Sequence, residues 1–122
     1  MIIKNEKFKD TLLAALGDRE VVKILRSVLF QSKSMADISK ETVIPQTTVF
    51  RKIKWMLENR LLVIEKMNIT KDGKKTSLFR SIWKTISAKF DNGIMHVEVQ
   101  QNVNQSEIIT KKMFSLDPVI EE

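Results

Sequence analysis

Lysine and arginine side chains are concentrated in the middle of this sequence, where they could bind phosphate groups. The 122 residues carry a formal net charge of +6. Between Lys33 and Lys89 there are 13 Lys and Arg against 5 Asp and Glu, a net charge of +8, whereas the rest of the chain has a net charge of −2. Clustered cations favour nucleic acid, because each phosphate that they neutralise releases condensed counterions. A solvated surface without such a ligand is the alternative explanation.

Few side chains in the sequence could perform catalysis or hold a metal ion. There is no cysteine and a single histidine, His96, on the polar face of an expected strand. The sequence contains neither a Gly-rich phosphate loop nor a His-Glu-x-x-His pattern. We therefore expect no enzyme, no cofactor and no metal site.

The pattern between Ser34 and Trp83 predicts a helix, a tight turn, a second helix and a hairpin. Ser34 begins the first helix, because an acidic residue follows three positions later in a capping pattern. Pro45 ends that helix and suits the start of the next, 46–58. Asp72-Gly73 then predicts a hairpin turn. Two helices, a tight turn and a basic hairpin form a unit that can read a nucleic-acid groove, and we expect the nucleic acid to be DNA.

Further helices are expected before this unit. Asn5 caps a helix through about Leu16, and Asp18 caps a second helix to about Gln31. Their apolar stripes at helical spacing indicate core or dimer contacts. The short third helix is expected to add Met35 to the core.

Beyond the helices the apolar period changes from helical to alternating. Strands are expected at 61–69, 76–90 and 94–101, the second of them a long strand that can bend. Asn92-Gly93 favours a two-residue turn in which Phe90 pairs with Met95. In this register six apolar side chains share one face: Ile86, Ala88, Phe90, Met95, Val97 and Val99. A short final helix is expected within 104–116.

The two tryptophans, Trp55 and Trp83, allow two interpretations. Aromatic side chains among basic residues can stack on the bases of single strands. Trp55 lies late in its helix and Trp83 follows the basic hairpin, so packing in a core or interface is the favoured interpretation.

Segment 44–62 resembles the winged helix-turn-helix domain of ArsR- and MarR-like transcription regulators of archaea and bacteria. The shared pattern is an apolar residue, a proline, small polar residues, a valine, an aromatic residue, an arginine and a leucine-rich helix end. The family usually closes with Gly-Leu-Ile, whereas Arg60 stands at the glycine position here. Asn59, just before it, could take the left-handed cap conformation. The resemblance covers residues 18–83.

The resemblance implies the helix-turn-helix core and β-wing of an α+β fold. With the elements that the sequence pattern predicts on either side, we expect three N-terminal helices, a recognition helix, a β-wing, an additional β-hairpin and a short C-terminal helix. We expect one domain, 1–122. Its helix-turn-helix core is expected at 18–62, its wing at 61–83, and its additional hairpin and C-terminal helix at 84–118.

The resemblance also implies that helix 46–58 lies in the major groove of double-stranded DNA. The base-reading residues that it implies are Gln46, Thr47, Thr48, Phe50, Arg51 and Lys54. The residues that it places on the DNA backbone or in the minor groove are Ser34, Lys40, Lys71, Lys74 and Lys75. Gln46 could bond adenine, and Arg51 could bond guanine or a phosphate. Phe50 could contact a thymine methyl group or pack against the preceding helix.

These implications predict a sequence-specific DNA-binding transcription regulator in the cytoplasm, associated with the nucleoid. We expect a homodimer that pairs through the helices at 5–16 and 104–116, with the 86–99 hairpin. We expect no membrane association, because no apolar run is long enough to span a bilayer. The alternative function is a winged helix that binds protein in the transcription or replication machinery. The basic, polar start of 46–58 favours DNA over protein.

Overall fold

Four helices precede four strands in the structure, a computed structural model that describes residues 1–102 of the 122. The helices are α1 (Glu6–Leu16), α2 (Arg19–Ser27), α3 (Met35–Thr42) and α4 (Gln46–Glu58). The strands are β1 (Leu62–Ile69), β2 (Lys75–Ser81), β3 (Trp83–Asp91) and β4 (Ile94–Gln101). They pair as two antiparallel hairpins, β1–β2 and β3–β4. The α+β class is confirmed in this part of the chain, and the helix expected within 104–116 lies outside the described residues.

All four helices begin where the sequence predicts them, three of them at a side-chain cap. Side-chain oxygens of Asn5, Asp18 and Ser34 accept backbone N–H bonds from the first turns of α1, α2 and α3, respectively. Each bond satisfies a donor that has no partner within its own helix. α4 instead follows Pro45 and has no side-chain cap.

α2 ends at Ser27, before the end near Gln31 that the sequence predicts. The chain beyond α2 is held by β2 instead. The Ser81 N–H donates to the Val28 oxygen at 3.1 Å, and Lys33 exchanges two backbone hydrogen bonds with its bridge partner on β2. Backbone groups that are bonded to a strand are not available to continue a helix. The predicted boundary was wrong because these contacts join distant parts of the sequence.

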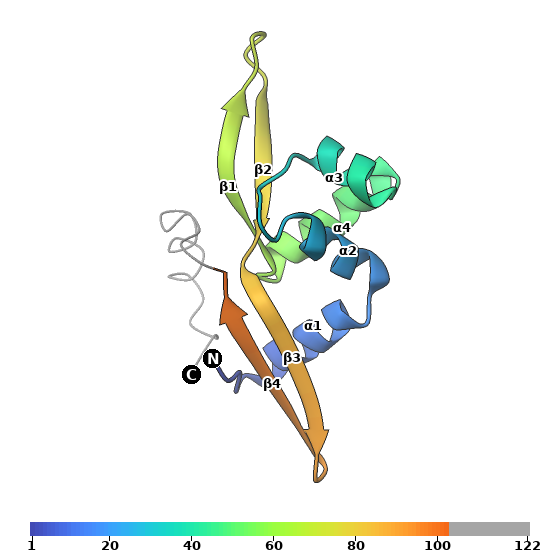
Figure 1. Cartoon of the computed structure of the whole chain (residues 1–122), viewed down its shortest axis with the longest axis vertical. Coiled ribbons are helices and arrows are strands. Elements are labelled where there is room, and N and C mark those ends of the chain that lie inside the picture. The colour runs from blue at the N-terminus through green and yellow to red at the C-terminus, as the bar shows by residue number, and fades with distance from the viewer. Residues whose placement is uncertain (103–122) are drawn as a thin grey trace.

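The long strand expected at 76–90 is divided at Ile82. Ile82 is fully buried, its N–H donates to the Leu61 oxygen at 3.0 Å, and its oxygen accepts from the Asn102 N–H at 2.8 Å. β2 pairs with β1 before this point, and β3 pairs with β4 after it. The two hairpins therefore extend from the helical body in opposite directions, β1–β2 beside α3 and β3–β4 beside α1 (Figure 1).

The β3–β4 hairpin has the predicted register. Asn92 and Gly93 both have positive φ angles, 52° and 77°, as a type I′ turn requires, and Phe90 pairs with Met95. The predicted apolar face is covered from the middle of the hairpin to its base, where Val97 and Val99 are buried, whereas Phe90 at the tip is 71% exposed. This face therefore belongs to the core at one end and meets solvent at the other.

Residues before α1 pair with the edge of β4, which the sequence analysis missed. Ile2 forms an antiparallel bridge with Glu98. The Ile3 N–H donates to the Val97 oxygen at 2.9 Å, and the Val99 N–H donates to the Met1 oxygen at 2.8 Å. The start of the described chain thus acts as a short third strand.

The core lies between the helices and the bases of both hairpins. Its fully buried side chains include Leu12, Val21, Ile24, Ile38, Val49, Met56, Leu61 and Leu62. Trp83 is also buried, with its ring 6.3 Å from the Phe8 ring and its Nε1 donating to the Arg60 oxygen at 2.9 Å. Trp55 is partly buried against the core. The packing interpretation of Trp83 is confirmed.

Arg60, and not Asn59, takes the left-handed conformation after α4, with φ angles of 58° and −107°, respectively. Asn59 could tolerate this conformation but does not take it, because a tertiary contact supports the arginine instead. Its guanidinium lies 5.5 Å from the centre of the Phe8 ring. Burial lowers the pKa of Arg60. Packing of a long side chain thus holds a conformation that glycine commonly supplies.

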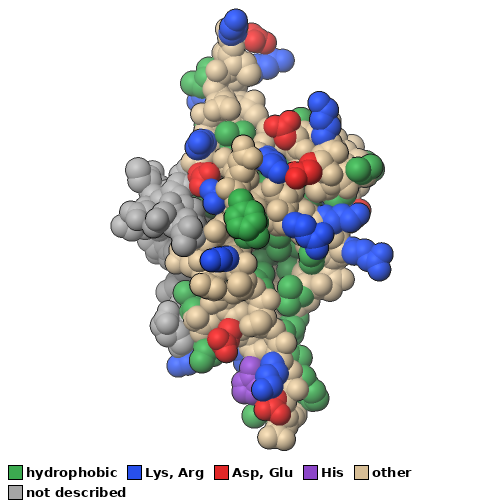
Figure 2. Space-filling view, viewed as in Figure 1, with side chains coloured by type: hydrophobic (Ala, Val, Ile, Leu, Met, Phe, Trp, Pro, Cys, Tyr) green, Lys and Arg blue, Asp and Glu red, His purple; other side chains and the backbone are tan. Residues whose placement is uncertain are grey.

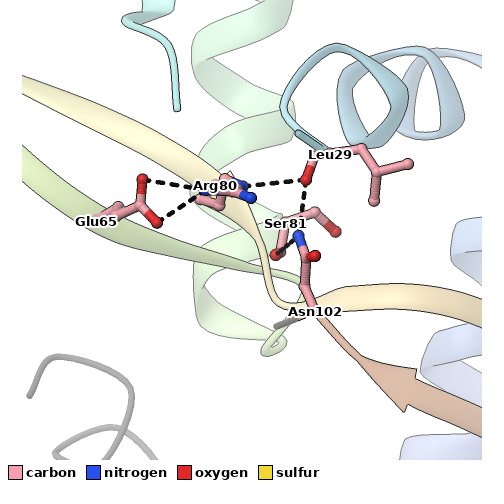
Figure 3. A network of polar contacts seen from close by, with 5 residues as sticks. All are labelled: Leu29, Glu65, Arg80, Ser81 and Asn102. Atoms are coloured by element: carbon pink, nitrogen blue, oxygen red, sulfur yellow. Dashed lines mark hydrogen bonds and ion pairs between the residues drawn. The ribbon is translucent and has the colours of Figure 1, made fainter. Parts of the chain in front are cut away.

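A polar network joins the junction of the hairpins to the loop after α2 (Figure 3). Arg80 donates to Glu65 and, through Nε, to the Leu29 oxygen, both at 3.0 Å. Nδ2 of Asn102 donates to the same Leu29 oxygen at 2.8 Å and to the Ser81 oxygen at 3.1 Å. Ser81 and Asn102 are buried, so these bonds satisfy polar groups that water cannot reach.

Candidate nucleic-acid interface

One side of α4 is open to solvent and carries most of the side chains predicted to read bases. The exposed residues are Gln46, Thr47, Phe50, Arg51 and Lys54. The residues buried on the opposite side are Val49, Ile53 and Met56. Because successive residues turn about 100° around a helix, the exposed positions share one face. α4 is therefore anchored in the core by one side and available to a ligand on the other.

Thr48 lies apart from the other predicted base-reading residues. It is half-buried and stands about 200° around the helix from Phe50. A ligand that lies against the exposed face of α4 would meet Gln46 and Thr47 before it met Thr48. The structure thus brings together five of the six predicted residues.

The turn between α3 and α4 is short and closely held. Ser39 Oγ donates to the oxygen of the buried Ile44 at 2.6 Å. Val43 has a φ of 59° and is 86% exposed, an unfavourable conformation for a β-branched residue. Since no side chain caps α4, the N–H groups of its first turn have no side-chain acceptor. Such a helix start can receive a phosphate oxygen.

The two α3 residues predicted to touch phosphate differ in their availability. The Ser34 hydroxyl oxygen accepts the Asp37 N–H at 3.2 Å and so serves as the cap of α3. Lys40 is exposed in the last turn of α3. Lys40 is therefore the freer of the two.

The turn of the β1–β2 hairpin exposes three lysines. Strand pairing ends at Ile69 and Lys75, and Thr70 then exchanges backbone and hydroxyl bonds with Lys74. Gly73, with a φ of 80°, donates its N–H to the Thr70 oxygen at 2.9 Å. The predicted Asp-Gly turn is thus present. The lysines that it exposes are Lys71, Lys74 and Lys75.

Some cations near this surface are neutralised by neighbouring carboxylates. Lys52 donates to Asp18 at 2.5 Å, and Lys33 donates to Glu41. Burial would raise the pKa of Asp18, but the bond from Lys52 and the backbone bonds at the start of α2 together lower it. Bonds from Lys33 and Ser27 lower the pKa of Glu41. Both carboxylates therefore stay charged at neutral pH and keep their lysines paired.

Other cations have no ion pair with any residue in 1–102. The predicted DNA-contact residues among them are Lys40, Arg51, Lys54, Lys71, Lys74 and Lys75. All six are exposed. Figure 2 shows Lys and Arg side chains at the tip of β1–β2 and over the helical side of the molecule. This surface can therefore attract a polyanion without first breaking internal ion pairs.

An apolar notch lies between α3 and α4; we call it the α3–α4 notch. The residues that line it are Met35, Gln46, Thr47 and Phe50. Phe50 is 59% exposed and Met35 is half-buried, so Met35 is less deeply placed than the core position that we expect from the sequence. The sequence analysis missed the notch because its two apolar residues belong to different helices.

No family model, curated protein or solved structure matches this chain. Its function is therefore inferred from the exposed surface itself. Within residues 1–102, His, Cys, Asp and Glu side chains do not gather in groups of three or more that could hold a metal ion. No helix in that range is both long enough and apolar enough to cross a membrane.

The apolar stripe of α1, for which the sequence predicts a core or dimer contact, is used in the core. Phe8, Leu12 and Ala15 are buried, and Leu16 is 39% exposed. The tip of β3–β4 leaves more apolar surface free, with Phe90 and Ile94 at 71% and 55% exposure. A second copy would therefore find more uncovered apolar surface there than on α1.

Proposed function

We propose that this chain is a winged helix-turn-helix protein that binds double-stranded DNA and regulates transcription in a sequence-specific manner. The observation that carries the proposal is the solvent face of α4. It combines Gln46 and Arg51, which can bond base edges, with the cation Lys54. Its opposite side is fixed in the core, so these side chains are presented by a rigid helix.

In the proposed complex α4 lies in the major groove. Gln46 can form two hydrogen bonds with adenine, and Arg51 can bond guanine O6 and N7 or a phosphate. The β1–β2 hairpin acts as the wing, with its tip lysines on flanking phosphates or in the minor groove. Contacts of the wing add affinity for any sequence, whereas contacts of α4 add preference for one sequence.

The number of cations that contact phosphates sets the salt dependence of DNA binding. Six predicted contact residues are cations without an ion pair within residues 1–102: Lys40, Arg51, Lys54, Lys71, Lys74 and Lys75. If each of them contacts one phosphate, a plot of the logarithm of the binding constant against the logarithm of the salt concentration has a slope of about −5. Fewer contacts would give a proportionally smaller slope.

We further propose that the protein acts on DNA as a homodimer in the cytoplasm and is not an enzyme. A two-fold dimer would present two α4 helices to two half-sites about one helical turn apart. Within residues 1–102 we assign no contact between the two copies. The predicted contribution of 104–116 lies outside that part.

The proposal is tested by measuring duplex binding by fluorescence anisotropy across a salt series. A preferred duplex is first selected from a random pool and then compared with a scrambled duplex. We expect Arg51→Ala to weaken binding to the preferred duplex by about 1–3 kcal/mol, and binding to the scrambled duplex much less. Lys84→Ala, an exposed cation on β3, is the matched control and should bind like the wild type.

Two results would count against this function. Equal losses on both duplexes would make Arg51 a phosphate contact without sequence preference. No binding at low salt would favour the alternative, a protein-interaction module. The alternative is favoured by two exposed apolar residues, Val43 in the turn before α4 and Phe50 on α4 itself.

A further inference from the structure

The α3–α4 notch is the part of the proposed DNA surface that charge does not explain. Met35 and Phe50 bring an apolar wall to a face that is otherwise polar and basic. Phe50 leaves 59% of its surface in water, although removing such a ring from water is favourable. Phosphate contacts require no apolar wall, so the notch indicates a ligand group of a different kind.

We propose that the notch binds the C5-methyl group of a thymine, and that Phe50 makes binding depend on that methyl group. The inference rests on the proposed function, because it places the notch in the major groove. There the thymine methyl is the one apolar group among the hydrogen-bonding atoms of the base-pair edges. Cytosine and uracil present the same position without a methyl group.

Gln46, a polar residue of the notch, suits the adenine that pairs with this thymine. Gln46 lies one helical turn before Phe50, so the two side chains are neighbours on the face of α4. An adenine–thymine pair shows an adenine edge that suits a glutamine amide and, beside it, the thymine methyl. An amide and an apolar ring that line one notch therefore complement a single base pair.

The charges around the notch favour DNA over an apolar protein partner. Arg51 and Lys54 share its helix face and have no ion pair within residues 1–102. A protein that covered the notch with apolar side chains would also remove these cations from water, which costs free energy of desolvation. In a groove, phosphates flank the bases and can neutralise them.

The experiment replaces each thymine of the selected duplex by deoxyuridine, which removes only the methyl group. We expect at least one replacement to weaken binding of the full-length wild-type protein about three- to fivefold, the effect of exposing one buried methyl-sized group. Phe50→Ala should bind the thymine and uracil duplexes equally, whereas Phe50→Leu should keep part of the preference.

Phe90→Ala is the matched control, because Phe90 is also an exposed phenylalanine but lies at the β3–β4 tip. It should keep the wild-type preference for thymine. Thermal unfolding of each variant shows whether the fold is intact, which is expected because both rings are largely exposed.

Each other outcome overturns part of the account. Wild-type binding that is equal for every thymine and uracil pair would overturn the inference and leave the proposed DNA binding intact. A preference for thymine that survives in Phe50→Ala would remove the role of Phe50. A wild-type protein that selects no preferred duplex, or binds none, would overturn the proposed function and the inference together.

Discussion

The two hairpins leave one junction in opposite directions, and their tips present different side chains (Figure 1). Residues 62–81 of β1–β2 include five Lys and Arg against two Asp and Glu, whereas residues 83–101 of β3–β4 include two of each sign. Three lysines surround the turn of β1–β2. Exposed Phe90 and Ile94 surround the turn of β3–β4. The β1–β2 tip also exposes Ile69, at 69%, so the two hairpins differ in charge: β1–β2 is a cationic arm, and β3–β4 is an arm without net charge.

The bases of the two hairpins are alike. Leu62 and Val63 at the base of β1–β2 are fully buried, and Val99 near the base of β3–β4 is 2% exposed. Burial of the bases fixes both hairpins to one core, and the tips contribute little to it. The comparison therefore separates residues that specify the fold from residues that are free to specify a partner.

The largest effect is expected from removing the tip lysines of β1–β2. Alanine at 71, 74 and 75 should reduce the salt slope of duplex binding by about 2.7, so that from 50 to 200 mM salt the variant loses about 40-fold less affinity than the wild type. Alanine at both Lys84 and Lys89 of β3–β4 is the control. An equal change in the control would erase the distinction between the hairpins.

The division of the apolar face of β3–β4 into a buried base and a free tip predicts unequal stability effects. Val97→Ala removes fully buried methyl groups and should lower the free energy of unfolding by about 2 kcal/mol. Phe90→Ala should change it by less than about 0.5 kcal/mol, since the ring is mostly in water. Urea denaturation measures both. A large loss in Phe90→Ala would show that the tip is packed in solution.

The junction between the hairpins offers a third test. Asn102→Ala removes the side-chain hydrogen bonds to the Leu29 and Ser81 oxygens. Ser81 is buried, so water cannot replace the lost bond to its oxygen. We expect a loss of about 1.5 kcal/mol in the free energy of unfolding. Gln101→Ala, an exposed neighbour, should be neutral. Equal stability of the two variants would show that the network does not hold the junction.

The smallest effect is expected at Asp18, which lies outside both hairpins. Asp18→Ala removes the cap of α2 and the partner of Lys52, and should cost about 1 kcal/mol at pH 7. The pKa of Asp18 is lowered in the folded chain, so its charged form stabilises the fold above about pH 4 and this stabilisation is lost as the pH falls further.

The stability difference between wild type and Asp18→Ala should therefore be smaller at pH 3 than at pH 7. Asp18→Ser keeps a capping oxygen but not the ion pair, so at pH 7 its free energy of unfolding should lie between those of the wild type and Asp18→Ala. A difference that grows at low pH would contradict the lowered pKa.

Local chemistry made part of this fold predictable. Asn5, Asp18 and Ser34 cap helices through bonds that span two or three residues, and Asn92-Gly93 sets a register by its own backbone conformation. Helical periodicity likewise predicted which side of α4 is exposed.

Features that depend on distant contacts were not predictable in this way. The division at Ile82 and the early end of α2 both depend on hydrogen bonds between segments far apart in the sequence. The left-handed Arg60 depends on Phe8, and the α3–α4 notch depends on Met35 meeting α4. Thr48 was grouped with its neighbours in sequence although it faces another side of the helix. DNA binding itself stays a prediction.

The most direct test of DNA binding maps the contacted residues by NMR. The amide signals of the ¹⁵N-labelled chain are followed while the selected duplex is added at low salt. The account predicts shifts at 46–54 in α4 and at 71–75 in the β1–β2 turn, with no change at 88–95 around the tip of β3–β4. Shifts confined to 88–95, or none anywhere, would contradict it.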